Sequence, residues 1–361
     1  MDEGFLFKKL KERVQNNSLR TLVVHNNKTD FCSNDYLGIS TNHLLRSREG
    51  LRPGSTGSRL LAGNYEMIEE AESIVAAFHQ SESALIYNSG YDANVGLLSC
   101  IPQRGDTIVY DQLSHASIRD GIRISFAESF SFNHNDPESL EQRLKQSSGN
   151  IFVVTESVFS MDGDLAPLLD LCALCSKYSA NLIVDEAHAT GVIGERGEGL
   201  VQQLQLQDQV FARIHTFGKA LGTHGAAVLG SKTLKEYLIN FSRPFIYSTA
   251  LPETTTDHII QSYKLFPRMI EERKKLNNLI SIFQSSQIKF GKLKSNTSIQ
   301  GVIVPGNEEA RTLAKTLQDN DLDVRAILYP TVPKGAERLR IVLHSFNSEE
   351  ELIKLLSILQ I

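Results

Sequence analysis

The feature of this sequence that most restricts its fold is a regular alternation, from about residue 84, of short apolar runs with longer helix-like segments. This alternation predicts an α/β domain around a largely parallel sheet, because parallel neighbours are joined by crossover connections that are usually helical. We expect seven strands in this domain. They lie at residues 84–87, 107–110, 130–132, 151–155, 181–185, 212–216 and 226–230.

The pattern changes after about residue 250. A long charged helix is expected to run to about Phe283, and the strands IQGVIVP and RLRIVLH that follow are separated by single helices. We therefore predict an N-terminal helix and arm at 1–35, a large α/β domain at 36–250 and a small C-terminal α+β domain at 251–361. The first segment, MDEGFLFKKLKERV, predicts an amphipathic helix.

Composition excludes several classes of protein. The formal charge of -5 and the lack of a long basic run argue against nucleic acid or an anionic membrane as a partner. The sequence has no run of 18 apolar residues, so no membrane span is predicted. Its four cysteines are too few for a dense disulfide framework and fit a reducing compartment, so we expect a cytoplasmic protein. Cys172 and Cys175 lie three residues apart in an apolar helical pattern, which favours core packing over a metal site.

In an open α/β sheet, ligands bind beyond the carboxyl ends of the strands, so polar residues there are candidates for a functional site. Asp185 ends the predicted strand 181–185, and His188 follows in a turn. A carboxylate emerging from a buried strand needs a cation beside it. The protonated nitrogen of a pyridine ring is one candidate, and an ordinary salt bridge is the alternative.

Lys219 lies in FGKALG, 34 positions beyond Asp185 and directly after another predicted strand. Gly218 and Gly222 beside it would let the backbone pass close to a bulky ring. A lysine desolvated there would lose its proton and become an imine-forming nucleophile. The alternative is an ordinary surface lysine.

Three further strand ends carry polar groups. Gly90 and Tyr91 open a predicted helix whose free N–H groups suit a phosphate, although a plain turn and helix cap would look the same. His115 and Ser160 follow two other strands, where a histidine could stack on a ring and a hydroxyl could bind its phenolate oxygen. Structural roles are the alternative for each residue alone. Together, five such strand ends favour a pyridoxal phosphate (PLP) site.

The segments NDYLG, GSTGSRLLAGN, DQLSHAS, TESVFSMDGD, VDEAHATGVIG, TFGKALG, IYSTALP and PTVPKGAERLRI resemble those of the α-oxoamine synthases, over nearly the whole chain. These are PLP-dependent enzymes with the aspartate aminotransferase-like fold (fold type I). The chain looks most like members that join L-alanine to a pimeloyl thioester, with loss of CO2, in biotin biosynthesis. The resemblance also implies a homodimer with shared active sites.

The resemblance implies that Lys219 forms the Schiff base with PLP and serves as the catalytic base, while His115 stacks on the ring and hydrogen-bonds the acyl oxygen. The other implied cofactor-binding residues are Gly90, Tyr91, Ser160, Asp185, His188, Thr216 and, from a neighbouring subunit, Ser248 and Thr249. The implied substrate-binding residues are Arg20, Asn34, Tyr36, Ser58, Thr331 and Arg340. Among these, Arg340 would pair with the amino acid carboxylate, and the small Ser58 would leave room for the methyl group of alanine.

Several alternatives stay open. A sister synthase would use glycine or serine with another acyl thioester, and a PLP aminotransferase would use the same Asp and Lys pair. A cofactor-sensing domain of a transcription regulator would need a DNA-binding module and a basic face. The segments on either side of NDYLG are shorter than in typical members, which leaves open whether the acyl carrier is coenzyme A or acyl carrier protein (ACP).

Overall fold

The structure, a computed structural model, describes residues 3–22, 24 and 28–360. The chain forms two compact units. The larger unit comprises Leu37–Ser160 and Leu165–Arg273, and the smaller comprises Met1–Tyr36, Met161–Asp164 and Lys274–Ile361.

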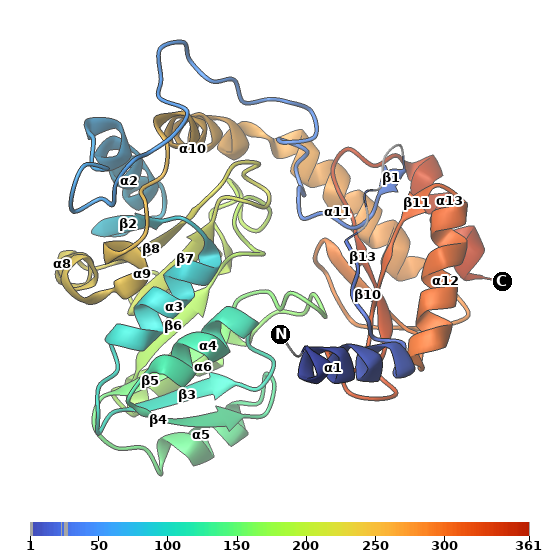
Figure 1. Ribbon diagram of the computed structural model, residues 1–361, viewed down its shortest axis with the longest axis horizontal. Coiled ribbons are helices and arrows are strands. Elements are labelled where there is room, and N and C mark those ends of the chain that lie inside the picture. The colour runs from blue at the N-terminus through green and yellow to red at the C-terminus, as the bar shows by residue number, and fades with distance from the viewer. Residues whose placement is uncertain (1–2, 23, 25–27, 361) are drawn as a thin grey trace. The chain divides into compact units, whose positions relative to one another are not determined.

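The larger unit is built on a seven-stranded sheet (Figure 1). Its strands are β2 (Ser83–Tyr87), β3 (Thr107–Asp111), β4 (Glu128–Phe132), β5 (Ile151–Glu156), β6 (Asn181–Asp185), β7 (Ala212–Thr216) and β8 (Ala226–Gly230). They are arranged in the order β2-β8-β7-β6-β5-β3-β4, and β8 alone runs antiparallel to its neighbours in this sheet. All seven predicted strands are confirmed, and so is the mainly parallel sheet.

Helices connect and cover these strands. They are α2 (Glu66–Phe78), α3 (Gly90–Cys100), α4 (Ala116–Ile124), α5 (Pro137–Leu144), α6 (Leu168–Lys177), α7 (Leu200–Gln203), α8 (Lys232–Phe241), α9 (Arg243–Ile246) and α10 (Glu253–Leu265). Leu97 of α3 and Ile118 of α4 belong to one core cluster with Ile183 of β6. Every residue of β5 is buried, which explains why the central strands read as continuous apolar runs.

The prediction of one long helix to about Phe283 is wrong. Helix α10 ends at Leu265, a 3-10 turn (η1, Phe266–Arg268) follows, and α11 runs over Ile270–Ser285. Pro267 causes the break, because it has no N–H to donate and its ring clashes with the preceding turn. Beside the break, the buried guanidinium of Arg273 donates to the Phe266 carbonyl oxygen at 2.7 Å.

The compact units also differ from the expected domain boundaries. Helix α10 belongs to the larger unit, where Asp257 forms an ion pair with Arg48 at 2.7 Å and the Tyr65 hydroxyl lies 2.6 Å from that of Thr256. The larger unit therefore extends to Arg273 rather than ending near residue 250. Contacts made by side chains of α10 attach this helix to the larger unit, although the sequence pattern changes before it.

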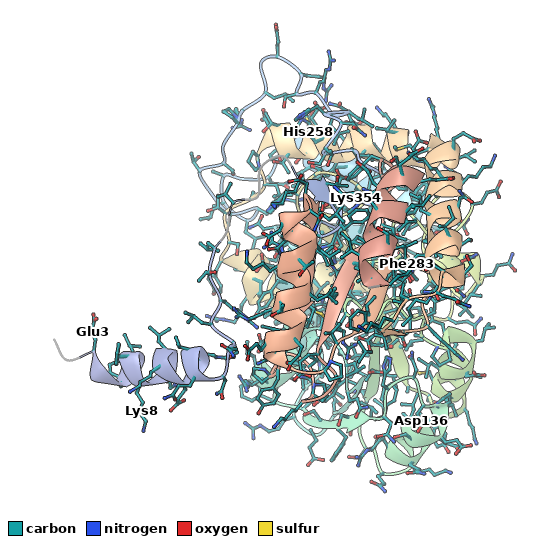
Figure 2. All side chains as sticks on the ribbon, turned by 90° about the vertical axis from the view of Figure 1, so that its right-hand side faces the viewer. Glu3, Lys8, Asp136, His258, Phe283 and Lys354 are labelled. Carbon is teal, nitrogen blue, oxygen red and sulfur yellow. The ribbon has the colours of Figure 1, made fainter. Side chains whose placement is uncertain are left out.

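The smaller unit contains the two ends of the chain. Its further elements are α1 (Gly4–Gln15), β1 (Thr29–Asp30), β9 (Gly291–Lys292), β10 (Ile299–Ile303), α12 (Asn307–Asp319), β11 (Leu322–Asp323), β12 (Arg325–Ile327), β13 (Arg338–Val342) and α13 (Glu349–Leu359). The antiparallel order β12-β13-β10-β9 confirms the two strands expected in IQGVIVP and RLRIVLH. Figure 2 looks onto the helices beside this sheet, among them α13 with Lys354.

Helix α1 confirms the helix predicted at the N-terminus. None of its residues is buried, and the side chains of Phe5 and Phe7 are 67% and 69% exposed. Figure 2 shows its side chains, including Lys8, standing out around the helix. Within the described chain, its apolar side is therefore uncovered.

The cysteine pair behaves as predicted for core positions. Cys172 and Cys175 are both buried on α6, and burial raises the pKa of the Cys172 thiol to about 11. Among the described residues, no helix combines the length and the apolar character needed to cross a membrane.

Candidate active site

The carboxyl ends of the central strands bring polar side chains together in the larger unit. Asp185 is the last residue of β6, Glu156 the last of β5 and Thr216 the last of β7. In the sheet register Glu156 lies beside Asp185. Adjacent strands are about 4.8 Å apart, so the side chains of these two residues extend from neighbouring backbone positions on one face of the sheet.

Asp185 is held by two donors. One carboxylate oxygen accepts the N–H of Ala187 at 2.9 Å, and the other accepts Nδ2 of Asn94 at 2.7 Å. Asp185 is only 5% exposed. Because each oxygen keeps a second lone pair, the carboxylate is oriented and can still accept a hydrogen bond from a ligand.

His115 precedes α4 and caps it. Its Nδ1 accepts the N–H of Ser117 at 3.2 Å and lies 2.8 Å from the Ser117 hydroxyl. Desolvation lowers the pKa of His115, and the charge of Lys219 acts in the same direction, while that of Asp185 opposes it. The ring is therefore neutral at pH 7 with Nδ1 as acceptor, which leaves Nε2 as its N–H donor.

Lys219 lies half-buried in the turn after β7. Its charge lowers the pKa values of both His115 and Glu156, so its ammonium lies close to the same strand ends. Gly222 has φ +64°, and a Cβ there would be 2.7 Å from that of Ile39. A glycine at position 222 is therefore explained by the backbone conformation of this turn rather than by the space that a bulky ring would need. Gly218 is not crowded, since a Cβ there would meet no atom closer than 3.7 Å.

The start of α3 fits closely against the end of β7. A Cβ on Gly90 would lie only 2.4 Å from Cγ2 of Thr216. The Ser89 hydroxyl caps the helix by accepting the N–H of Asp92 at 3.0 Å. The Tyr91 hydroxyl donates to Asp120 at 2.6 Å, so its side chain is engaged elsewhere and its backbone remains at the helix start. Such a helix N-terminus is suited to an anion.

The other predicted residues of the larger unit lie in turns. Ser160 follows β5 and is half-buried, and His188 follows β6 and is buried. Thr249 follows α9, and its carbonyl accepts Nδ2 of Asn88 at 2.8 Å, which places Thr249 and its neighbour Ser248 beside the segment that opens α3. Ser58 forms a turn in which its carbonyl accepts the N–H of Gly63 at 2.9 Å.

Five predicted substrate-binding residues belong to the smaller unit, where they form two groups. Arg340 on β13 donates from Nη2 to Oδ1 of Asn34 at 2.9 Å, and the Tyr36 hydroxyl donates to the same oxygen at 3.2 Å. Burial raises the pKa of Tyr36 to about 12, so its hydroxyl remains a donor. Arg20 donates to the Thr331 hydroxyl at 3.2 Å in an exposed contact.

Sequence reasoning missed two residues that support His115 and Asp185. Asn94 bridges them, because its Nδ2 also donates to the Ser117 hydroxyl at 3.0 Å, and Glu156 accepts the N–H of His115 at 2.7 Å. The motif GYDAN has Asn94 one helical turn after Gly90, which was the available signal. Glu156 was missed because β5 was expected to end one residue earlier.

Comparison with known proteins agrees with this arrangement. Residues 26–359 match the aminotransferase class I and II family, and the chain belongs to this family. It is 41% identical over 366 residues to 8-amino-7-oxononanoate synthase from Emericella nidulans, covering 92% of this chain and 89% of that protein.

Solved structures are similar over most of the chain. The 8-amino-7-oxononanoate synthase from Francisella tularensis is 28% identical with a TM-score of 0.77, covering 92% of this chain and 97% of that one. A serine palmitoyltransferase from S. paucimobilis, solved with a bound PLP–myriocin aldimine, is 26% identical with a TM-score of 0.87, covering 99% and 96%. The predicted fold type I is confirmed.

Proposed function

We propose that this enzyme is a PLP-dependent acyltransferase that condenses L-alanine with a pimeloyl thioester. The products are 8-amino-7-oxononanoate, CO2 and the free thiol carrier, in biotin biosynthesis. The observation that carries the proposal is the 41% identity to an 8-amino-7-oxononanoate synthase along about nine-tenths of both chains. The acids and bases at the strand ends of the larger unit support it.

The residues of the larger unit fit PLP. Asp185 offers an oriented carboxylate to a pyridinium N–H, and Gly90 opens a helix start whose N–H groups suit a phosphate. Lys219 offers the primary amine that holds the cofactor, and Thr216, Ser160 and His188 belong to the same strand ends. When bound, PLP supplies an electron sink for negative charge at the alpha carbon of the amino acid.

The protein's own groups then handle the protons. Asp185 keeps the pyridine nitrogen protonated because a carboxylate favours a cation beside it. Nζ of Lys219, as a free amine, accepts the alpha proton of alanine. Nε2–H of His115 donates to the acyl oxygen as negative charge develops there, a role that its neutral tautomer allows.

Substrate binding is proposed for the smaller unit and for Ser58. The guanidinium of Arg340, oriented by Asn34, would bind the amino acid carboxylate, since its fork matches a carboxylate in shape. Tyr36 would hold Asn34 in place, and Arg20 and Thr331 would contact the acyl chain.

A homodimer with shared active sites is also part of the proposal. Ser248 and Thr249 of a neighbouring subunit would complete the phosphate pocket, and support for this comes from the resemblance of IYSTALP to the family motif. A cytoplasmic location and a choice between pimeloyl-CoA and pimeloyl-ACP as the acyl donor also remain predictions.

The test is an assay of the purified enzyme with pimeloyl-CoA and, in turn, alanine, glycine and serine. We expect thiol and CO2 in equal amounts with alanine, at a rate about 10-fold or more above glycine, because a pocket distinguishes one methyl group by about 1–3 kcal/mol. Pyruvate formed from alanine without released thiol would contradict the proposal and indicate an aminotransferase.

The second candidate is a sister synthase that uses serine. The observation in its favour is the TM-score of 0.87 with a serine palmitoyltransferase over 99% of this chain. Replacing pimeloyl-CoA with palmitoyl-CoA in the same assay separates the two. Faster thiol release with serine and palmitoyl-CoA than with alanine and pimeloyl-CoA would favour this second candidate.

The close fit at Gly90 gives a sharp prediction. Gly90→Ala should weaken PLP binding about 10-fold or more, because the added Cβ would lie 2.4 Å from Cγ2 of Thr216 and push the helix start away from the strand end. Thr216→Ser removes that methyl group and keeps the hydroxyl. The double variant should therefore recover part of the lost affinity, as measured by fluorescence titration of the apoenzyme with PLP. Equal affinity of Gly90→Ala and wild type would contradict this account.

A further inference from the structure

Glu156 is a buried acid that the proposed chemistry does not use. It ends β5 beside Asp185 of β6, and it is only 3% exposed. Two carboxylates in neighbouring register positions on one sheet face repel each other when both are charged. An arrangement in which one of them keeps its proton avoids that repulsion.

The contacts show which of the two is suited to be neutral. Asp185 receives two donors, from Ala187 and from the Asn94 amide. Glu156 accepts the single N–H of His115 at 2.7 Å. A carboxylate accepts this N–H more strongly, but the carbonyl oxygen of a neutral carboxylic acid accepts it too, so the contact does not require a charge.

Burial and the neighbouring carboxylates act in the same direction. Burial, with the charges of Asp185 and Asp111, raises the pKa of Glu156 to about 8, although the N–H of His115 and the charge of Lys219 oppose this. Asp111 already has a partner, since His134 lies 3.0 Å from it. Lys219 is the cation whose charge acts on Glu156 in the opposite direction, and in the proposed function its amine holds the cofactor.

Hydrogen bonds around His115 form a chain from Glu156 to Asp185. Glu156 holds the backbone N–H of His115, and the ring Nδ1 of His115 pairs with the Ser117 hydroxyl. Asn94 then connects Ser117 to Asp185, the register neighbour of Glu156. One hydrogen-bond network thus orients both His115, which is proposed to stack on the PLP ring, and Asp185, which is proposed to pair with the nitrogen of that ring.

We propose that Glu156 is a positioning residue that works as a neutral carboxylic acid, fixing the backbone of His115 and leaving the negative charge of this register pair on Asp185. Its effect on turnover rests on the proposed function, because it acts through His115. Its protonation does not, and can be measured whatever reaction the enzyme catalyses.

The test uses holoenzyme carrying Glu156→Gln, which keeps the accepting oxygen and cannot ionise. The infrared difference spectrum of wild type minus variant at pH 6 should contain the carbonyl stretch of a protonated carboxylic acid. A carboxylate band in its place would overturn the proposal.

The thermal denaturation midpoints of wild type and Glu156→Gln, compared over a range of pH, give a second test of whether Glu156 is neutral. Folded Glu156 keeps its proton up to about pH 8, whereas the unfolded side chain loses it near pH 4.3. Wild type should therefore lose stability relative to Glu156→Gln as pH rises between these values. The variant should exceed wild type by several degrees at pH 8 and by much less at pH 5. A constant difference would count against a buried neutral acid. Glu128→Gln, at an exposed position on β4, is the matched control and should show no such trend.

Activity separates positioning from charge. Glu156→Gln should keep kcat within about threefold of wild type, whereas Glu156→Ala should lose about tenfold or more in kcat with a smaller change in KM, because the His115 N–H loses its acceptor. A loss in Glu156→Gln as large as in Glu156→Ala would overturn the proposal. If the acyl-transfer assay fails while the infrared band is present, the proposed function fails and the neutral acid stands.

Discussion

Lys219→Ala is expected to lower kcat by about 1,000-fold or more and to remove the visible absorption band of lysine-bound PLP. Under the proposed function two roles would be lost together, because Nζ would no longer hold the cofactor and no amine would remain to take the alpha proton of alanine. Both readouts come from one purified protein, with the spectrum recorded before substrate is added. PLP itself should still bind, since Asp185 and the start of α3 are unchanged.

Lys232→Ala is the matched control for this prediction. Lys232 is an exposed lysine at the start of α8 in the same unit, so its loss should change neither the spectrum nor kcat. An unchanged absorption band in Lys219→Ala would remove Lys219 from the cofactor site. If Lys219→Ala loses the absorption band but keeps normal turnover, Lys219 anchors the cofactor but is not the catalytic base.

Asp185→Asn is expected to lower kcat by about 1,000-fold, equivalent to about 4 kcal/mol of transition-state stabilisation. The amide carries no charge to keep the pyridine nitrogen protonated, so the electron sink weakens. The amide also presents an NH2 group where a carboxylate oxygen now accepts a hydrogen bond. Either Asn94 or the N–H of Ala187 then loses its acceptor, which should weaken PLP binding as well.

Asp170→Asn on the exposed surface of α6 is the control for charge removal and should behave as wild type. Far-UV circular dichroism of Asp185→Asn should match that of wild type, which would assign the loss to the site rather than to unfolding. Wild-type turnover by Asp185→Asn would show that Asp185 is an ordinary strand-end acid, as the salt-bridge interpretation of the sequence allowed.

Much of the candidate site could be proposed from the sequence because its polar residues directly follow predicted strands in the chain. The apolar run ending at Asp185, the turn containing Lys219 and the His115 segment were all recognisable from local pattern, and the sheet then places strand ends on one edge. Glu156 and Asn94 were not recognised. Their roles depend on the register of β5 with β6 and on the side of α3 that faces the sheet, and neither is a local property of the sequence.

The same distinction applies to the fold. Pro267 shows that a local signal can be overlooked, since a proline in a helical pattern predicts a break. Local sequence signals do not reveal the extent of the larger unit. Helix α10 belongs to it through side-chain contacts such as the Asp257–Arg48 ion pair, whose residues are 209 positions apart in the chain.

The sequence by itself determined the seven strands, their α/β arrangement and the reactive side chains at their ends, because hydrophobic periodicity and turn residues act locally. Only the tertiary structure decided that Glu156 lies beside Asp185, that Gly90 fits against Thr216 and that the ring of His115 keeps its proton on Nε2. These features arise from burial and from hydrogen bonds between residues far apart in the chain. Such contacts form only when the sheet is complete.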